Sequence, residues 1–592
     1  MRASRTSSRV RSTLHLISAA TLGLTSFALS PMPAFGLEQP AAVTPGEEQA
    51  SSGGAAATAL SQSSPSSPIG AEPVEPQVTD LPLQTLPAAS RTTVDATVER
   101  VRWADGELVA HAVRTSVPEF AMVGVTWDQA EGLAEVTAQV RSLDDDGWSD
   151  WAALHAPDDE GPSGTEEPGA RAGTQPGWVG SATGFEIAVY ADKGVAPRNL
   201  EVSIIDPGTS PYDAQALAAP NASEQRSGTL RSNSRAGTFP KLPRVISREE
   251  WGADESVGDQ CWDPRLGTTF KMVFVHHTAG SNDYAESESA AVVRGILAYH
   301  VVSRGWCDIG YNFLVDRYGN VYEGRSGGIR QPVRGAHSGD YNVNTTGISA
   351  MGNFDIAAPS EAMKSALVKL ISWRLGTAYH GGFGRTSVEG DKFARISGHR
   401  DAMSTACPGR YIYDWLPTLR DRVRDRLGTN VTPIEARWRL LGGGKSPLGV
   451  VRIGEQGLNG GHFTAFSKGR MYASPAGVFS LYRGPILSRY KRAGEVEGVL
   501  GYPKSGMFAA GHDTGNGAMF AGGRIYWSVA TRSRLLVRSP VLQRYLTEKG
   551  PRGSLGFPKT GIVDTSTGHQ ATFEHGTISY DKATRRTTIT VP

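Results

Sequence analysis

An internal repeat in residues 433–592 constrains the fold more than any other feature of the sequence. Three units open at Pro433, Pro485 and Pro540, so the starts lie 52 and 55 residues apart. Each unit continues through a Leu-Gly step and ends in a strand-like stretch containing Gly469-Arg-Met-Tyr472, Gly523-Arg-Ile-Tyr526 or Gly576-Thr-Ile578. Because these motifs recur in the same order and at similar spacing in three copies, the sequence predicts small, similar units that pack as neighbours.

The Leu-Gly step of these units is part of a longer motif. The second and third units carry Leu500-Gly-Tyr-Pro503 and Leu555-Gly-Phe-Pro558, whereas Leu448-Gly449 lacks the aromatic residue and the Pro. The units resemble the cell-wall repeats that are named after Leu-Gly-Phe-Pro. The resemblance implies binding to wall polysaccharide; the alternative is a repeat that packs only on itself or on the preceding domain.

The length of the whole chain and its charge balance limit the possible architectures. A chain of 592 residues is too long for one core and indicates three or four domains. Lys and Arg number 60 against 59 Asp and Glu, a balance that gives no reason to expect a nucleic-acid partner. The 70 Gly and 35 Pro favour loop-rich β structure and linkers over a helical bundle.

The N-terminus has the pattern of a secretory signal peptide over residues 1–36. Four Arg residues precede a short apolar segment, Leu14–Leu29, and Ala34-Phe-Gly36 offers small residues at cleavage spacing. The alternative is an uncleaved anchor, although this run is short for a span of about 20 residues. We therefore expect a secreted, cell-wall-associated protein with no membrane span after signal removal.

Composition divides the region before residue 241. Residues 37–90 are rich in Ala, Ser, Pro, Gly and Glu and predict a disordered linker. Residues 91–207 predict a β-sandwich of unknown role, because apolar and polar residues alternate in Phe120–Trp127, Ala134–Arg141, Phe185–Tyr190 and Leu200–Ile205. The acidic, Gly-rich stretch 157–176 predicts a loop, and 208–240 predict a second linker.

Residues 241–428 change to a mixed α/β pattern. The apolar run Phe270–His276 predicts a buried strand, and Asn312–Glu323 predict a β-hairpin. Helical spacing of apolar residues predicts helices over Glu286–Val302, Ser360–Leu375 and Ile412–Leu427, the second capped by Ser360 and the third followed by Gly428. We expect a central mixed sheet with flanking helices.

Three residues of this region are good zinc ligands. His276, His399 and Cys407 offer two imidazole nitrogens and a thiolate, which leave a fourth position for water, as in catalytic rather than structural zinc sites. Spacing alone leaves this reading open, because a histidine on a buried strand is also a common core residue.

The residues around these candidates form a set of motifs with a known order. They are Phe274-Val-His-His-Thr-Ala279, Gly305-Trp-Cys-Asp-Ile-Gly-Tyr-Asn-Phe-Leu-Val315, Gly319-Asn-Val-Tyr-Glu-Gly-Arg325, Gly335-Ala-His337 with Tyr341-Asn-Val-Asn344, and Gly398-His-Arg-Asp401 with Ala406-Cys-Pro-Gly409. The region resembles the peptidoglycan recognition proteins and the related type-2 N-acetylmuramoyl-L-alanine amidases.

The resemblance implies a Zn²⁺ cofactor with the ligands His276, His399 and Cys407. It makes Tyr311 and Thr405 the candidate catalytic residues. At the position of Thr405 some relatives carry Lys and others Thr, and because Thr supplies no positive charge its role is left open. His277 is expected to pack or to support the ligands. With Cys407 on the metal, Cys261 and Cys307 remain to form a disulfide in an oxidising compartment; either alternative pairing with Cys407 would destroy the site.

Four further residues are candidates for binding substrate. His300 and His337 resemble groove-wall positions, although His300 is equally compatible with packing on the sheet. Glu323 is a candidate proton donor to the leaving amine. The planar guanidinium of Arg325 suits a substrate carboxylate, and a surface salt bridge is the alternative.

The activity that the resemblance implies is hydrolysis of the amide between N-acetylmuramic acid and L-alanine of peptidoglycan. The runner-up hypothesis is a module that binds peptidoglycan without cutting it. Non-catalytic relatives typically lack the Cys ligand, so Cys407 favours the enzyme. A third hypothesis makes tethering the main role, with the repeats and the sandwich holding the chain on the wall.

Overall fold

The structure is a computed structural model of the whole chain. It describes residues 72–95, 98–99, 106–130, 134–156, 161–162, 167, 169–192, 194–218, 240–258, 264–429, 431–511 and 515–591. The expected signal peptide, most of the first linker and Cys261 lie outside these residues, so the Cys261–Cys307 pairing stays a prediction. Among the described helices, none is long and apolar enough to cross a membrane.

The first folded region is a β-sandwich, as predicted. Within the described residues, one antiparallel sheet joins β1 (Gln77–Pro82), β10 (Glu201–Asp206), β3 (Phe120–Trp127), β7 (Ala172–Gly173) and β8 (Gly177–Ala182). The facing sheet joins β2 (Glu107–Arg114), β9 (Gly184–Ala191), β4 (Val136–Asp144), β5 (Gly147–Trp148) and β6 (Ala152–Leu154). The alternating apolar residues meet in one core between the sheets, as the period of two requires.

Both predicted linkers extend too far into folded structure. The linker predicted for 37–90 is wrong over Gln77–Pro82, which forms β1 and pairs with β10, and helix α1 begins at Ala88. The linker predicted for 208–240 contains α2 (Asp213–Ala218). In both places the composition wrongly predicted a linker, because a short element at the edge of a domain needs few apolar residues of its own once a neighbouring sheet supplies the core.

The central region contains a mixed sheet that positions the candidate site. Its order is β13 (Val321–Glu323), β12 (Phe313–Val315), β14 (Thr345–Ala350), β11 (Met272–His277) and β17 (Ile396–Gly398). The strands β12, β14, β11 and β17 run parallel, and β13 returns antiparallel as the predicted hairpin. The carboxyl ends of the parallel strands therefore meet along one edge of the sheet.

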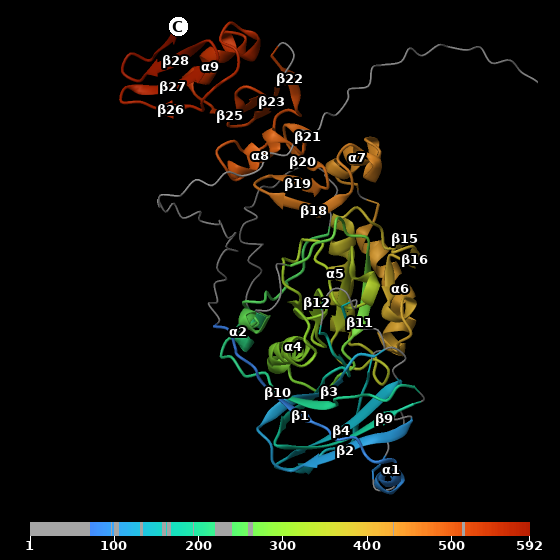
Figure 1. Cartoon of the computed structure of the whole chain (residues 1–592). Coiled ribbons are helices and arrows are strands. Elements are labelled where there is room, and N and C mark those ends of the chain that lie inside the picture. The colour runs from blue at the N-terminus through green and yellow to red at the C-terminus, as the bar shows by residue number, and fades with distance from the viewer. Residues whose placement is uncertain are drawn as a thin grey trace, which may run out of the picture. The chain divides into compact units, whose positions relative to one another are not determined.

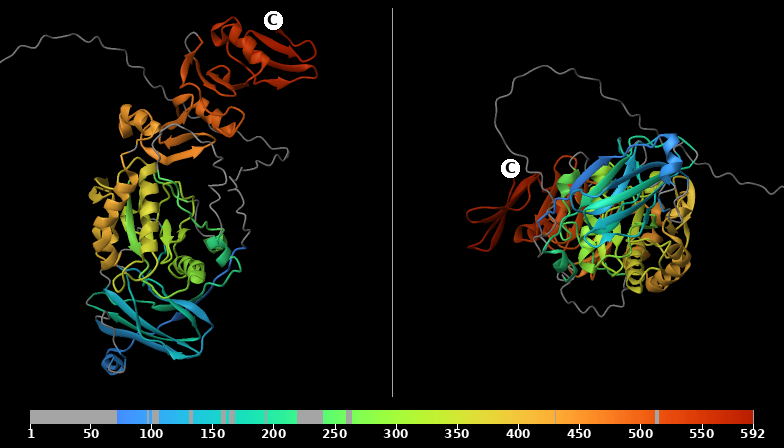
Figure 2. Two further views of the ribbon diagram at one scale, coloured as in Figure 1. Left: turned by 180° about the vertical axis from the view of Figure 1, so that it is seen from behind. Right: turned by 90° about the horizontal axis from the view of Figure 1, so that it is seen from below.

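Helices cover both faces of this sheet (Figures 1 and 2). On one face α5 (Glu361–Thr377) and α6 (Arg410–Leu427) share a core with the strands, and α4 (Ser289–Ala298) packs on the other. The predicted caps are present: the Ser360 side chain accepts a hydrogen bond from the Met363 N–H, and Gly428 ends α6 with φ of 59°. A single turn of π-helix, Tyr299–Ser303, continues α4.

The C-terminal region consists of three similar units, each a short helix and an antiparallel sheet. The first contains α7 (Pro433–Leu440), β18 (Val451–Leu458), β19 (Gly461–Phe466), β20 (Gly469–Ser474) and β21 (Gly477–Tyr482). The second contains α8 (Pro485–Arg492), β22 (Phe508–Ala510), β23 (Gly515–Phe520), β24 (Gly523–Ser528) and β25 (Arg532–Val537). The third contains α9 (Pro540–Thr547), β26 (Val563–Asp564), β27 (Gly568–Phe573), β28 (Gly576–Asp581) and β29 (Arg586–Thr590).

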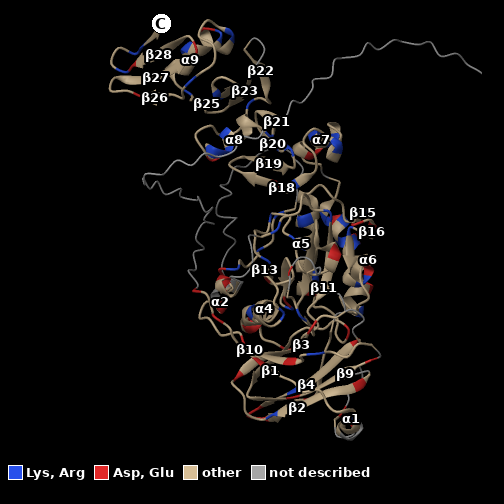
Figure 3. Cartoon of the chain, in the orientation of Figure 1, with Lys and Arg blue, Asp and Glu red and all other residues tan. Residues whose placement is uncertain are grey.

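The structure shows why the same residues recur in each unit. The prolines open the helices, where their missing N–H costs nothing, and basic residues in the last turns of α7 and α8 complement the helix dipoles (Figure 3). The leucine of each Leu-Gly step is fully buried, and each glycine has a positive φ, between 58° and 77°. The aromatic residue then packs against a glycine of the preceding unit: Tyr502 on Gly461, and Phe557 on Gly515.

The degenerate first unit packs on the central region instead. Its core residues join the cluster that α5 and α6 form with the sheet. The buried Glu455 accepts hydrogen bonds from Tyr379 Oη at 2.8 Å and from Thr432 Oγ1 at 2.5 Å. The alternative role that the sequence left open, packing on the preceding domain, therefore applies to the first unit.

The glycine that receives Phe557 generates a prediction about the repeats. We expect Gly515→Ala to destabilise the third unit by about 1–3 kcal/mol, because a Cβ there would overlap the Phe557 ring. The control is Gly457→Ala in β18, where a Cβ meets nothing closer than 4.0 Å. Amide hydrogen exchange of residues 540–591 measures the effect, and equal protection in both variants would contradict it.

Candidate metal centre

Three side chains with metal-binding atoms meet at the carboxyl edge of the sheet. The candidate ligand atoms of His276, His399 and Cys407 all lie within 4.8 Å of one another, and the three residues are buried. His276 is the next-to-last residue of strand β11, and His399 directly follows β17. Because β11 and β17 are parallel neighbours, with Val275 opposite Gly398, both histidines leave the sheet at the same level.

Cys407 reaches this pair from the loop that leads into α6. Its Sγ lies 3.6 Å from His276 Nδ1 and accepts a hydrogen bond from the His277 backbone N–H at 3.3 Å. Such a donor favours the thiolate, which is the form that binds metals. The Thr405 hydroxyl accepts a hydrogen bond from the Cys407 N–H at 3.2 Å. The position of Thr405 therefore orients the loop that carries Cys407.

The donor set fits a zinc ion. Burial lowers the pKa of His276 to about 3, so its imidazole is neutral, as a metal ligand must be. Two imidazole nitrogens and one thiolate within a few ångströms are ligands that zinc prefers. Three ligands from the protein leave one position for another molecule, which distinguishes catalytic from structural zinc sites.

His337 lies behind the centre and contacts one of the candidate ligands. Its Nδ1 is 3.2 Å from His276 Nε2 and 2.9 Å from Ser338 Oγ. With His276 Nδ1 facing Cys407, an N–H at His276 Nε2 can donate to His337 and fix the orientation of the ring. His337 is fully buried. This contact gives His337 a supporting role that the sequence did not suggest.

His277 points to the other side of strand β11, as alternation along a strand requires. Its Nδ1 accepts a hydrogen bond from the Phe354 N–H at 3.2 Å. The structure thus places His277 in the packing role that we expected.

Tyr311 and His300 lie on the side of the centre that faces the β-sandwich. The Tyr311 ring is 5.5 Å from the His276 ring and 5.9 Å from the His300 ring, measured between centroids. His300 stacks on Trp306 at 4.3 Å, and its Nδ1 accepts a hydrogen bond from the Gly310 N–H. The phenol of Tyr311 therefore lies beside the candidate ligand His276, whereas His300 packs against Trp306 and Tyr311.

The two charged candidates on and after β13 have different surroundings. The pKa of Glu323 is raised to about 7, chiefly by burial and against the attraction of Arg248. The charged groups that act on it are Arg248, Glu255 and Asp308. Arg325 donates a hydrogen bond from its backbone N–H to the Tyr311 carbonyl oxygen, which keeps it near the centre.

The sequence analysis did not identify two residues of the β-sandwich region that contact Arg325 and Tyr311. Glu167 forms an ion pair with Arg325 at 2.5 Å, and Gln175 Oε1 accepts a hydrogen bond from Tyr311 Oη at 3.4 Å. Both belong to the stretch 157–176, which we predicted as a loop. Nothing in its acidic, Gly-rich composition signals a contact with residues more than a hundred positions away.

A family model and curated relatives match the region of the chain that contains these residues. The model of the N-acetylmuramoyl-L-alanine amidase family matches residues 266–410. Peptidoglycan-recognition protein SC1a/b of Drosophila simulans is 34% identical over 175 residues, which are 29% of this chain and 82% of the relative. The chain belongs to the peptidoglycan recognition protein family. Another member, peptidoglycan recognition protein 1 of Mus musculus, is 35% identical over 170 residues, 28% of this chain and 84% of the relative.

The regions on either side of the peptidoglycan recognition domain match other families. The family described as Rv3811 N-terminal galactose-binding domain-like matches residues 69–222, and the LGFP repeat matches residues 500–553. Among solved structures, human PGRP-IBETAC in complex with glycosamyl muramyl pentapeptide is 29% identical, with a TM-score of 0.26, and covers 30% of this chain and 96% of that chain.

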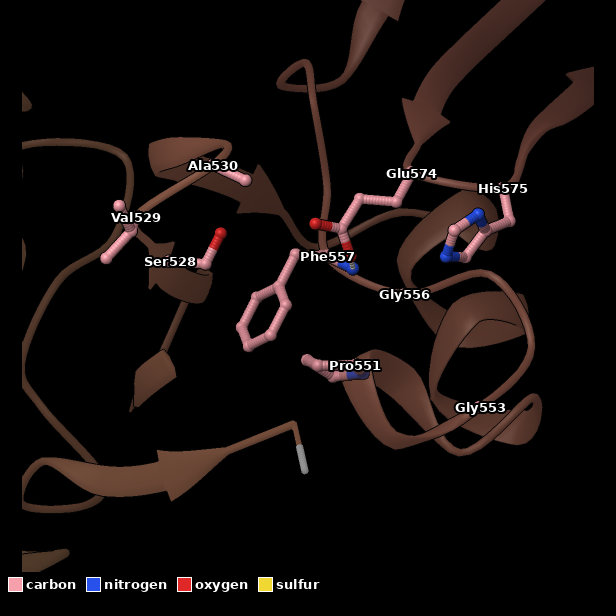
Figure 4. Close-up of a pocket in the computed structure, with 9 residues that line it drawn as sticks. All are labelled: Ser528, Val529, Ala530, Pro551, Gly553, Gly556, Phe557, Glu574 and His575. Carbon is pink, nitrogen blue, oxygen red and sulfur yellow. Dashed lines mark hydrogen bonds between the residues drawn. The ribbon is translucent and has the colours of Figure 1, made fainter. Parts of the chain in front are cut away.

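A second candidate site lies where the second and third repeats meet (Figure 4). The cavity has a volume of about 400 Å³, and its lining residues are Ser528, Val529, Ala530, Pro551, Gly553, Gly556, Phe557, Glu574 and His575. The Phe557 N–H donates a hydrogen bond to Glu574 Oε2 at 2.7 Å. The Phe557 ring is itself largely buried against Gly515 of the second unit, so the polar groups of the lining are what this cavity offers to a ligand.

The raised pKa of Glu323 predicts a pH-dependent stability. The folded state holds the proton up to about pH 7, while the unfolded carboxyl releases it near 4.5. The stability contributed by the protonated form is therefore fully present below pH 4.5 and lost as the pH rises through 7. We expect Glu323→Gln to stabilise the protein relative to wild type by about 1–3 kcal/mol at pH 8, and much less at pH 5.

Thermal unfolding at both pH values measures this difference. The matched control is Glu135→Gln, at an exposed position on the sandwich, which should change stability little at either pH. A Glu323→Gln variant that is equally stable relative to wild type at pH 5 and pH 8 would contradict the account.

Proposed function

We propose that this protein is a zinc-dependent N-acetylmuramoyl-L-alanine amidase that is secreted and held at the cell wall by its C-terminal repeats. The observation that carries the proposal is the convergence of the His276, His399 and Cys407 ligand atoms within 4.8 Å, with Tyr311 beside them. The family match and this donor set together favour hydrolysis over binding alone, because a module that only binds has no use for a buried thiol between two histidines.

Zinc would be held by His276, His399 and Cys407 and, when bound, supplies a Lewis acid that polarises the amide carbonyl and lowers the pKa of water. The residues around the ligands keep them in place. His337 orients His276, the His277 N–H holds the Cys407 sulfur, and Thr405 fixes the loop before Cys407.

Tyr311 is the group that we propose for the developing negative charge on the carbonyl oxygen. Its hydroxyl already donates to a carboxamide oxygen, that of Gln175, so a substrate amide oxygen at the same place would be bound in the same way. A hydrogen bond that strengthens as charge develops lowers the barrier more than it strengthens binding. The buried position of Tyr311 excludes competing water.

The repeats would concentrate the enzyme near its substrate. A wall polysaccharide bound at the cavity around Phe557 tethers the chain, and tethering raises the effective concentration of the catalytic centre at the wall. Arg325 is our proposed contact for a carboxylate of the stem peptide. His300 would line the groove beside Tyr311.

Digestion of purified peptidoglycan by the full chain tests the proposal. We expect products whose stem peptides begin at a free L-alanine, lost with a chelator and restored by zinc, as read by mass spectrometry. Cys407→Ser should lower the rate by at least about a hundredfold through loss of the metal, whereas Ser404→Ala, at an exposed neighbouring position, should retain it.

Two results would count against the amidase. Peptidoglycan that binds the zinc-loaded chain but releases no stem peptide would make the protein a recognition module. Undiminished hydrolysis by Cys407→Ser would remove Cys407 from the ligand set.

A further inference from the structure

Two polar groups from the β-sandwich region contact Arg325 and Tyr311 beside the metal centre. One is the carboxylate of Glu167, whose Oε1 lies 2.5 Å from Arg325 Nη2 and whose Oε2 accepts a hydrogen bond from the Cys307 N–H at 2.9 Å. Both side chains of the ion pair are largely buried, with 12% of Arg325 and 8% of Glu167 exposed. A pair in this environment is held firmly, because separating it leaves a buried charge alone.

The other group is the carboxamide of Gln175. Its Oε1 accepts the hydrogen bond of Tyr311 Oη, the hydroxyl that we assign to the substrate carbonyl. Gln175 is itself buried, and its backbone N–H donates to the His155 carbonyl oxygen at 2.6 Å. A primary amide therefore already accepts a hydrogen bond from the hydroxyl that we propose for the scissile amide.

The backbone between these groups is docked on the central region by specific contacts. Arg171 and Arg304 exchange two hydrogen bonds of 2.8 Å, from the Arg171 N–H to the Arg304 carbonyl oxygen and from Arg304 Nε back to the Arg171 carbonyl oxygen. The Tyr299 hydroxyl donates to the Thr174 carbonyl oxygen at 2.9 Å. A Cβ on Gly173 would come within 2.9 Å of that hydroxyl, so the glycine permits the close approach.

The location of this segment matters as much as its contacts. In α/β sheets ligands bind in the crevice outside the carboxyl ends of the parallel strands, which is where His276 and His399 lie. Both histidines are fully buried, with no exposed surface, and Tyr311 is 1% exposed. Groups that are buried to this degree become accessible to a polymeric substrate only when the residues that cover them move away.

We infer that the segment formed by Glu167 and residues 169–176 is a built-in substitute for the substrate, which keeps the amidase latent until this segment moves away from Arg325 and Tyr311. Its Glu167 carboxylate takes the place of a carboxylate of an acidic stem peptide on Arg325. Its Gln175 carboxamide takes the place of the scissile amide on Tyr311. Substrate and segment compete for the same partners, so anything that draws the sandwich away exposes the centre. The inference rests on the proposed function.

A different role for the same contacts makes the opposite prediction. If Glu167 and Gln175 were part of the productive groove, their loss would weaken substrate binding and slow hydrolysis. If they are substitutes for the substrate, their loss strengthens binding and accelerates hydrolysis. Substitutions in the segment therefore distinguish the two roles by the sign of the effect.

The test uses the full chain with Glu167→Lys, which places two positive charges together in the groove and expels the segment. We expect the initial rate of peptidoglycan hydrolysis to rise about tenfold or more, since the competent fraction rises. Gln175→Ala, a milder change that retains the fold, should raise the rate severalfold. Glu135→Lys is the matched control, with the same charge change at an exposed position on the sandwich, and should leave the rate unchanged.

Binding of a soluble muramyl tripeptide to the zinc-free chain, measured by calorimetry, separates this inference from the proposed function. If Glu167→Lys and Gln175→Ala bind the tripeptide more tightly than wild type but no zinc-loaded form hydrolyses peptidoglycan, the substitute is supported and the amidase is overturned. The opposite outcome is that zinc-loaded wild type hydrolyses peptidoglycan, while both variants bind the tripeptide no more tightly and hydrolyse peptidoglycan no faster than wild type. That outcome overturns the substitute and retains the amidase. Hydrogen exchange of residues 169–176 should increase in Glu167→Lys but not in Glu135→Lys; unchanged protection would also overturn it.

Discussion

The parallel pairing of β11 with β17 is the constraint on which the rest of the molecule depends. It places the last residues of two strands side by side at one edge of the sheet, so that His276 and His399 emerge together with their ring centroids 4.5 Å apart. The cores on the two faces, with α5 and α6 on one and α4 on the other, hold the strands in register. The proposed zinc site depends on the distance between His276 and His399 that this pairing sets.

A buried polar centre also requires that its neighbours be polar and well placed, because burial penalises any group that lacks a partner. Around His276 this requirement is met by His337, and around Cys407 by the His277 N–H. For Tyr311 and Arg325 the partners come from the sandwich region and are Gln175 and Glu167. The same physical demand that organises the centre therefore explains why a distant segment can occupy it.

Much of this could be predicted from the sequence, and the remainder has physical reasons. The strand that ends in His276, the capped helix after Ser360 and the repeat period follow from local patterns, and the structure confirms them. Edge strand β1 was missed because pairing with β10, not its own composition, stabilises it. The contacts of Glu167 and Gln175 were missed because they depend on how two separately folded regions dock, which no local periodicity reports. The surroundings of Glu323 were missed for the same reason, since Arg248 and Asp308 are distant in the sequence.

Zinc X-ray absorption spectroscopy of the metal-loaded full chain tests the central claim most directly. The account predicts two nitrogen scatterers of the imidazole type and one sulfur scatterer in the first shell, with the sulfur contribution lost in Cys407→Ser and the imidazole contribution reduced in His399→Ala. A shell without sulfur, or one that is the same in wild type and Cys407→Ser, would contradict a catalytic zinc held by His276, His399 and Cys407.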